Sequence, residues 1–344
     1  MNQEKLSQLF HHFVTKNNLP KACITLQDAV SGEKIKLTQG DMTTTTPFVL
    51  ASVTKLWVTT LILQLMDQNK LSYENIVTDF IEKEKIIQLH HFLGEDYTAS
   101  LTIRDLLFQR TGLPNIFFEE PVALRSRIAD EDFSYSFSEA VRWVKSIEAH
   151  FIPGSKEAYY ADINFILLGI IVESIHHQSL DDCIDKYIMC KLGLAHSYLA
   201  NSEFDIIPAL YIGGDYLKRP KLIASGQGAG GGISNSEDLM VFVRAFFEGV
   251  LFNKNHFDLL QDYLPLQGDY APVEYGGGHM KLSLGKYEDK DRLSFYGHSG
   301  ISGAFAFYCP ELNVYLTGTT DNAKKSELCI QLIYLLLFEL EKEA

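Results

Sequence analysis

The sequence offers a serine and lysine pair whose spacing suits nucleophilic catalysis, in the motif Ser52-Val-Thr-Lys55. Residues 48–66 around it are apolar at helical spacing, which predicts a helix that begins near Ser52. On such a helix residues i and i+3 share one face, so the amine of Lys55 would lie beside the hydroxyl of Ser52. A buried lysine loses part of its preference for the charged form, and a helix N-terminus favours the negative charge on an attacking oxygen. The pair therefore suits acyl transfer, with Ser52 as nucleophile and Lys55 as base.

The same four-residue pattern occurs twice more, as Ser31-Gly-Glu-Lys34 and Ser283-Leu-Gly-Lys286. Both copies contain glycine and sit in turn-like sequence, where a serine and a lysine would be solvated independently. Taken alone, even the motif at Ser52 is better explained by a capping serine and a surface lysine than by catalysis. Other residues have to decide between these explanations.

Two later segments carry further polar groups in contexts that fit a site. Tyr160-Ala-Asp162 precedes an apolar helical pattern over 164–173, and residues 295–300 (FYGHSG) close a segment with strand character. Each group also has an ordinary explanation. Tyr160 fits a half-buried core tyrosine, Asp162 fits a helix N-cap, and His298 fits a strand-end histidine with no ligand.

Together the three motifs resemble a known family. The segment 48–55 (FVLASVTK) is similar to the nucleophile helix of class C β-lactamases and their penicillin-binding, esterase and D-aminopeptidase relatives. Tyr160-Ala-Asp162 falls where that group carries Y-x-N, and His298-Ser-Gly300 falls where it carries K-T-G or H-x-G. The resemblance covers residues from about 20 to 320. Three motifs in the expected order and on the expected elements are far more specific than any one of them.

The resemblance implies a role for each of these residues. Ser52 would attack a carbonyl with Lys55 as helper base, and an acyl-enzyme would form that water then hydrolyses. Tyr160, pushed towards phenolate by the charge of Lys55, would take the proton of Ser52 and pass it to the leaving group. The backbone N–H groups of Ser52 and Ile301 would form the oxyanion hole. No metal and no organic cofactor is implied.

The strand motif would bind the substrate through His298, Ser299 and Gly300. Gly300 is expected to keep the strand edge open so that the acyl group can lie against it. His298 replaces the lysine of K-T-G, and a histidine is mostly neutral at pH 7 and titrates near it. Because a permanent positive charge is then missing, we expect ester or amide hydrolysis first, D-amino-acid peptidase activity second and β-lactamase activity third.

The resemblance implies that Asp162 orients Lys55 or the substrate amide, and this residue also departs from the family pattern, which has asparagine there. Its negative charge should hold Lys55 protonated more firmly, and this shifts the role of base towards Tyr160. The departures at Asp162 and His298, with Gln109 where relatives often carry histidine, leave an alternative open. In that alternative the chain is a catalytically silent binding protein with the β-lactamase fold.

The distribution of periodic segments predicts one α/β domain of the α+β type. A β-hairpin is expected over 22–37, strands over 293–296, 304–308 and 314–318, and a closing helix over 324–341. Between these ends the pattern is mostly helical. We therefore expect an antiparallel sheet built from N- and C-terminal segments and flanked by helices (residues 1–69 and 265–344), with a large helical insertion (70–264).

Bulk composition limits the classes of molecule that the protein is expected to bind. The formal net charge of −14 argues against nucleic acid and against anionic membrane surfaces, and no uninterrupted apolar stretch is long enough for a membrane span. A small-molecule or peptide-like substrate is the expected partner. The first 20 residues are amphipathic rather than a secretory signal, which favours a cytoplasmic location, and the oligomeric state stays open.

Overall fold

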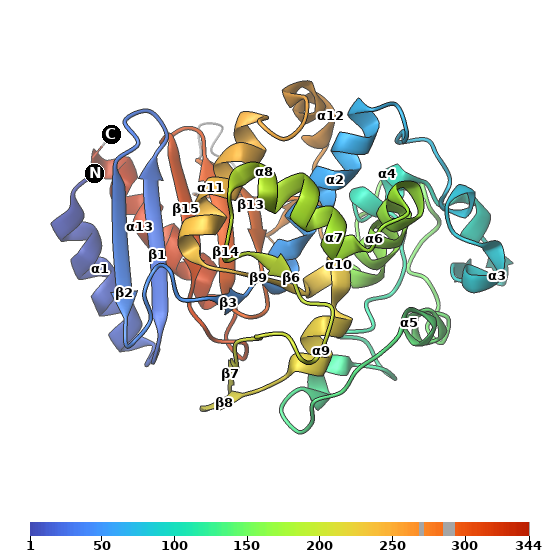
Figure 1. The fold of residues 1–344 in the computed structure, drawn as a ribbon, viewed down its shortest axis with the longest axis horizontal. Helices are drawn as coiled ribbons and strands as arrows, with labels where there is room; N and C mark the ends of the chain where they lie inside the picture. Colours follow the sequence, from blue (N-terminus) through green and yellow to red (C-terminus); the bar gives the residue numbers. More distant parts are fainter. Residues whose placement is uncertain (268–271, 285–292, 344) are drawn as a thin grey trace.

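The computed structural model describes residues 1–267, 272–284 and 293–343. Its main sheet joins the two ends of the chain, because β1 pairs with β2 on one side and with β15 on the other. All pairs in this sheet are antiparallel, and the described strands follow the order β10-β11-β12-β13-β14-β15-β1-β2 (Figure 1). The strands are β1 Ala22–Asp28, β2 Lys34–Gln39, β10 Leu264–Pro265, β11 Glu274–Tyr275, β12 Met280–Ser283, β13 Ser294–Ser299, β14 Ala304–Cys309 and β15 Val314–Thr319.

Helices cover both faces of the sheet. α1 (Gln3–Lys16) and α13 (Leu328–Glu343) pack against each other on one face, and α11 (Ser236–Glu248) lies on the other against β1, β14 and β15 (Figure 1). The residues of β15 are buried throughout, as expected for a central strand covered on both sides. In α1 the side chain of Asn2 caps the first turn and the apolar face is buried.

The remaining helices form a lobe beside the sheet (Figure 1). Its centre is α2 (Lys55–Asp67), which is buried from Lys55 to Met66 and packs against α6 (Asp162–His176). The other helices are α3 Lys83–Ile86, α4 Ile103–Leu107, α5 Phe137–Val144, α7 Leu180–Ile184, α8 Cys190–Leu192, α9 Pro220–Ser225, α10 Gln227–Gly230 and α12 Phe257–Leu260.

Short strands and 3₁₀ turns complete the chain. β3 (Phe48–Val49), β9 (Gly232–Ser234) and β6 (Tyr198–Leu199) form a small sheet beside α2, and two hairpins pair β4 (His91–Phe92) with β5 (Glu95–Asp96) and β7 (Leu210–Ile212) with β8 (Asp215–Leu217). The 3₁₀ turns are Ala51–Thr54, Val77–Asp79, Thr98–Ser100, Leu124–Arg127 and Lys254–His256.

The predicted fold class is confirmed, with corrections of detail. The helix expected to begin near Ser52 opens with the 3₁₀ turn Ala51–Thr54 and becomes α-helical only at Lys55. Within the mostly helical middle of the chain, α7 and α8 are separated by a π-helical turn, Asp185–Met189. The short strands β10, β11 and β12 were not predicted, because two- to four-residue strands leave almost no periodic signal. Of the alternative S-x-x-K motifs, Ser31 and Lys34 are exposed, and Lys286 lies outside the described residues.

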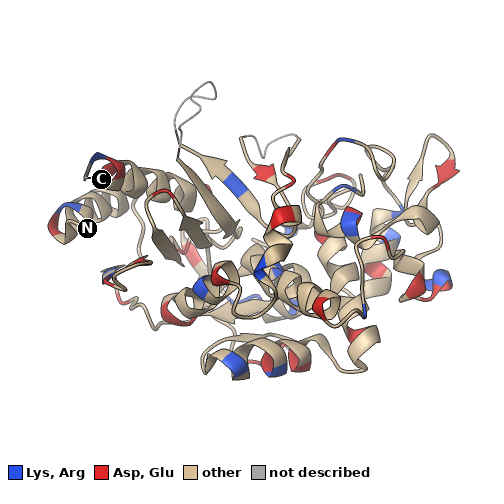
Figure 2. Cartoon of the chain, turned by 90° about the horizontal axis from the view of Figure 1, so that it is seen from above, with Lys and Arg blue, Asp and Glu red and all other residues tan. Residues whose placement is uncertain are grey.

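Charges of both signs are spread over the helices and loops (Figure 2). Among the described residues, no single helix combines the length and the apolar composition needed to cross a membrane. One bent pair, Asp162–His176 with Leu180–Leu192, reaches those criteria only jointly and turns by 78° between its members.

Candidate active site

Ser52 lies in a turn whose backbone is held from several sides. The N–H of Leu50 donates to the carbonyl of Gly232 (2.8 Å), and the hydroxyl of Ser302 donates to the carbonyl of Val49 (2.6 Å). Ala51 is in the left-handed region (φ 47°), which is unfavourable for a residue with a Cβ and persists only where the surroundings enforce it. The turn therefore presents the half-buried Ser52 to a cavity in one fixed orientation.

Two glycines let neighbouring segments approach this turn. A Cβ at Gly300 would lie 2.2 Å from the carbonyl oxygen of Leu50, and a Cβ at Gly232 would lie 2.6 Å from Oγ1 of Thr54. Gly300 is therefore required by contact with the backbone that precedes Ser52. The expected reason, an open strand edge for the acyl group, stays a prediction beside this one. The absence of a side chain brings the end of β13 against the nucleophile turn.

Lys55 is fully buried and its amine contacts three oxygen atoms. Nζ lies 3.2 Å from Oγ of Ser52, 2.7 Å from Oδ1 of Asp162 and 2.7 Å from the carbonyl oxygen of Ala229. Burial lowers the pKa of Lys55 below its usual value, and the negative charge of Asp162 opposes that shift. The explanation of Lys55 as a surface lysine is therefore wrong.

Asp162 is the first residue of α6 but does not cap it. The N-cap is Ala161, which has no side-chain capping bond, and the carboxylate of Asp162 pairs with Lys55 instead. The capping explanation for Asp162 is therefore wrong. The carboxylate is also one wall of the cavity, with a side chain about 20% exposed.

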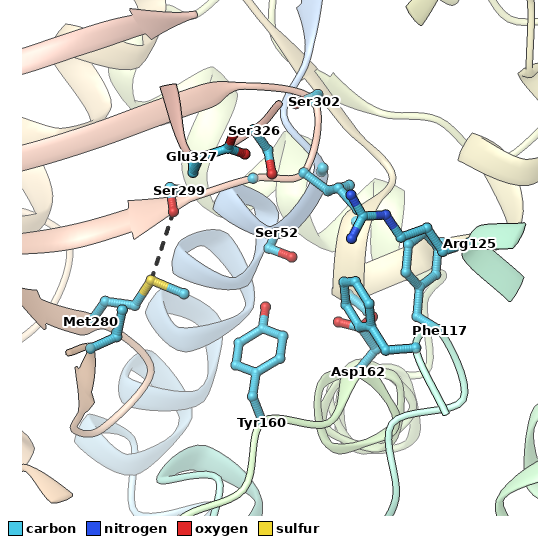
Figure 3. Close-up of a pocket in the computed structure, with 18 of the residues that line it drawn as sticks. Ser52, Phe117, Arg125, Tyr160, Asp162, Met280, Ser299, Ser302, Ser326 and Glu327 are labelled. Carbon is cyan, nitrogen blue, oxygen red and sulfur yellow. Dashed lines mark hydrogen bonds between the residues drawn. The ribbon is translucent and has the colours of Figure 1, made fainter. Parts of the chain in front are cut away.

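Tyr160 points its hydroxyl at Ser52 from the segment before α6 (Figure 3). Its backbone is fixed on both sides: Asn115 Nδ2 donates to its carbonyl oxygen (3.1 Å), and the N–H of Ala161 donates to Oε1 of Gln109 (3.0 Å). Gln109, where the family resemblance suggested histidine, thus positions the tyrosine segment.

The expected push of Tyr160 towards phenolate is wrong. Burial raises the pKa of Tyr160 well above its usual value, the charge of Asp162 raises it further, and a hydrogen bond with Ser52 opposes the shift only in part. Lys55 Nζ lies over the face of the Tyr160 ring, 5.0 Å from its centroid. The phenol is therefore protonated at neutral pH and has a proton to donate.

His298 is completely buried and is not among the residues that line the cavity. Its Nδ1 lies 2.7 Å from the carbonyl oxygen of Ser299, so Nδ1 carries the proton, because a carbonyl only accepts. Nε2 then accepts from the hydroxyl of Tyr275 at 3.3 Å. Burial and the nearby charge of Lys55 lower the pKa of His298 to about 3, so the expectation that it titrates near neutrality is wrong.

Tyr275 was missed by the sequence analysis. Its ring, fully buried, lies 5.9 Å from that of Tyr160 and 5.8 Å from that of His298, and the three rings form one cluster beneath Ser52. A tyrosine ahead of three glycines in an irregular segment carries no motif that would have revealed this position.

The end of β13 lies beside Ser52 and has no partner strand on one side among the described residues. Pairing with β12 stops at Gly297, whereas pairing with β14 continues to Ser299. Ser299 and Ile301 line the cavity. Within the part of the chain that the structure describes, the backbone N–H of Ile301 donates to no protein acceptor. The predicted substrate-binding residues Ser299, Gly300 and Ile301 thus surround Ser52, whereas His298 lies behind it.

The cavity in front of Ser52 has a volume of about 710 Å³ and largely apolar walls. One wall comes from the segment that contains Phe117 and Arg125, which the sequence analysis did not single out, and another from Glu327 at the start of α13 (Figure 3). Among the described residues, no cluster of three or more histidine, cysteine or acidic side chains could hold a metal ion.

Comparisons with known proteins agree with this geometry. Residues 8–333 match the family model described as Beta-lactamase. A putative D-alanyl-D-alanine carboxypeptidase from Salmonella schwarzengrund (strain CVM19633) is 33% identical over 156 residues, which cover 45% of this chain and 34% of that protein. The match to this curated relative therefore spans about a third of its length.

Two solved structures share the fold at low sequence identity. A D-stereospecific amidohydrolase from Streptomyces sp. superposes with a TM-score of 0.80 at 20% identity, over 96% of this chain and 98% of the other. The D-amino acid amidase from Ochrobactrum anthropi SV3, complexed with L-phenylalanine amide, gives 0.80 at 17% identity, over 100% and 99%. With the family model matched over nearly its whole length, the chain belongs to the Beta-lactamase family.

Proposed function

We propose that the chain is a serine hydrolase that cleaves esters or amides through an acyl-enzyme on Ser52. The observation that carries this proposal is the environment of the Lys55 amine. Of its three oxygen neighbours, the carboxylate of Asp162 and the carbonyl of Ala229 can only accept hydrogen bonds. In its charged form the Lys55 amine donates to the hydroxyl of Ser52 as well, at 3.2 Å. In its neutral form it donates to Asp162 and Ala229 and turns its lone pair towards that hydroxyl, and this arrangement supports Lys55 as the base.

The tyrosine then has a complementary role. As Ser52 attacks, its proton moves to Lys55, and the negative carbonyl oxygen is held by the N–H groups of Ser52 and Ile301. Tyr160, protonated because burial raises its pKa, donates its proton to the departing oxygen or nitrogen. In the second half, attacking water gives a proton to the Tyr160 phenolate, and Lys55 returns its proton to Oγ of Ser52. All protons are then restored.

We further propose that both lobes act as one catalytic domain. Ser299 and Ile301 come from the end of the main sheet, Tyr160 and Asp162 come from the start of α6, and Ser52 lies between them. For the amide class, the name of the curated relative refers to D-alanine, and the two solved structures are named as a D-stereospecific amidohydrolase and a D-amino acid amidase. Amides of D-amino acids are therefore the amide substrates to test alongside simple esters.

The decisive experiment is covalent labelling. A fluorophosphonate probe should add one adduct to the wild-type protein, detected by intact mass, and the adduct should be absent in Ser52→Ala. Ser31→Ala is the matched control, since Ser31 belongs to another S-x-x-K motif but is exposed on a turn. Turnover of short p-nitrophenyl esters and D-alanyl p-nitroanilide would then rank the substrates. Absence of any adduct and of any turnover would contradict the proposal and favour a catalytically silent binding protein.

A further inference from the structure

Arg125 stands out among the described arginines because its guanidinium makes no ion pair and no hydrogen bond with a described residue. Of the arginines that the structure describes, the other six use their side chains in ion pairs or in hydrogen bonds to carbonyl groups: Arg104, Arg110, Arg127, Arg142, Arg219 and Arg244. Arg125 makes neither, and its guanidinium only lies over the ring of Phe118, 5.4 Å from the centroid. The chain has 44 acidic and 30 basic residues, yet the guanidinium of Arg125 pairs with none of the described carboxylates.

The backbone at Arg125 is fixed by hydrogen bonds to a neighbouring segment. Its backbone N–H donates to the carbonyl of Phe117 (3.0 Å), and that of Leu124 donates to the carbonyl of Ile116 (3.1 Å). The same segment is tied to the catalytic tyrosine through Asn115, which donates to the Tyr160 carbonyl. The backbone of Arg125 is thereby fixed at the cavity wall, and its exposed guanidinium points towards Ser52 beside Phe117 and Asp162 (Figure 3).

The other charges of the cavity do not satisfy Arg125. Glu119 accepts from the hydroxyl of Tyr159 (2.8 Å) and lies 3.0 Å from Nε2 of His150, so its oxygens are already used. The charge of Asp162 is directed to Lys55. Glu327 lies on the side of Ser299, at the other wall of the cavity (Figure 3). Arg125 is thus the cation available to a bound molecule among the described residues that line the cavity.

We propose that Arg125 recognises a carboxylate on the acyl part of the substrate. This inference rests on the proposed function. A guanidinium binds a carboxylate through paired N–H donors, which suits a planar anion at a fixed distance from the reacting carbonyl. Arg125 and Tyr160 approach Ser52 from different directions (Figure 3). Because Tyr160 is the donor to the leaving group, we assign the carboxylate to the acyl part. This role also supplies the positive charge that the buried, neutral His298 does not.

The test compares two esters with the same leaving group, p-nitrophenyl hemiadipate and its methyl ester, which differ only in the carboxylate. The wild-type protein should prefer the hemiadipate, and Arg125→Gln should lower that preference in kcat/KM by about tenfold or more, mainly through a lower kcat/KM for the hemiadipate. Arg125→Lys should restore part of the preference, since it keeps the charge but not the paired donors. High salt should weaken the preference.

The matched control is Arg127→Gln, two residues further along the same turn. Arg127 pairs with Glu131 and does not line the cavity, so its loss should leave the preference unchanged. If the wild type shows no preference, or Arg125→Gln and Arg127→Gln behave alike, the inference is wrong although the hydrolase proposal stands. A preference only for a carboxylate placed on the leaving group would also overturn it. If neither ester is turned over and Ser52 takes no label, the proposed function itself fails.

Discussion

Ser52 separates two regions of different physical character. On its buried side, the amine of Lys55 donates to the carboxylate of Asp162 and to the carbonyl of Ala229, each at 2.7 Å. The rings of Tyr160, Tyr275 and His298 pack together on this side. On its open side, Arg125 and Glu327 are exposed and make no ion pair with a described residue. The buried side determines which protons can move, and the open side is free to select what is bound.

The difference follows from hydration. In the buried region charges are desolvated, so small changes of partner shift a pKa strongly, and each polar atom needs a defined neighbour. At the open wall water screens the charges, and a side chain such as Arg125 costs little when left without a partner. Substitutions on the buried side should therefore change the chemistry for every substrate, whereas those at the open wall should change only the choice among substrates.

Among the substitutions that test this difference between the buried and open sides, we expect the largest loss of activity at Lys55. Lys55→Met keeps an apolar chain of similar length but removes the base, and we expect kcat/KM to fall by about a thousandfold or more for charged and neutral esters alike. Lys34→Met, in the exposed S-x-x-K copy, should have no effect. Ester kinetics and circular dichroism of both variants would decide this. Activity within tenfold of wild type in a folded Lys55→Met protein would mean that Tyr160 is the base after all.

The sequence predicted the buried side better than the open side. Ser52, Lys55, Tyr160 and Asp162 were found because acyl transfer restricts residue types and because they stand in short motifs on regular elements. The structure brings all four together. Arg125 could not be found in this way, since its segment has no periodicity and its position depends on backbone bonds to Phe117.

The predictions that failed concern electrostatics. The sequence indicated that Tyr160 would be acidified by Lys55 and that His298 would titrate near pH 7. Both expectations assumed that the two side chains are in partial contact with water. Both rings are buried, and the sequence motifs that contain them do not reveal this. For groups this deeply buried, desolvation outweighs a single neighbouring charge. Motifs therefore identify which groups meet, whereas the protonation of those groups depends on packing that a motif does not encode.

The burial of His298 predicts a smaller, second effect, on stability rather than on catalysis. Its pKa is about 3 in the folded protein against 6.5 as the ordinary value, so between these values the unfolded chain binds a proton that the folded chain does not. The stability contributed by the neutral ring is therefore complete above pH 6.5 and is lost as the pH falls towards 3. At pH 5 the loss is about 2 kcal/mol, a factor of about 30 in the folding equilibrium.

Urea unfolding of wild type and His298→Gln at pH 7.5 and pH 5 measures this effect. Glutamine offers a donor and an acceptor for Ser299 and Tyr275 but cannot be protonated in this range. The loss of unfolding free energy between the two pH values should be about 2 kcal/mol smaller in the variant than in wild type. The same substitution at the exposed His12 of α1 is the control. Equal losses of unfolding free energy in wild type and His298→Gln would show that His298 is hydrated. His298 would then not belong to the buried side of Ser52.

The smallest predicted effect concerns the aspartate that replaces the expected asparagine. Lys55 must be neutral to accept the proton of Ser52, so kcat/KM should rise with pH along a limb governed by the pKa of Lys55. Burial lowers that pKa and the Asp162 carboxylate opposes the shift. In Asp162→Asn the opposition is removed, the pKa of Lys55 falls further, and the limb should move to lower pH by about one unit or more.

For each protein, kcat/KM at a pH on the rising limb is divided by its plateau value at high pH. With a shift of one unit, this ratio is about tenfold larger in the variant than in wild type. This normalisation separates the electrostatic effect from any loss of substrate contact at Asp162. Asp41→Asn, which breaks an exposed pair with Lys21, should leave the limb in place. A limb that stays fixed or moves to higher pH in Asp162→Asn would mean that a group other than Lys55 accepts the proton. Because Asp162 both pairs with Lys55 and lines the cavity, it is the residue through which the open side can tune the base of the buried side.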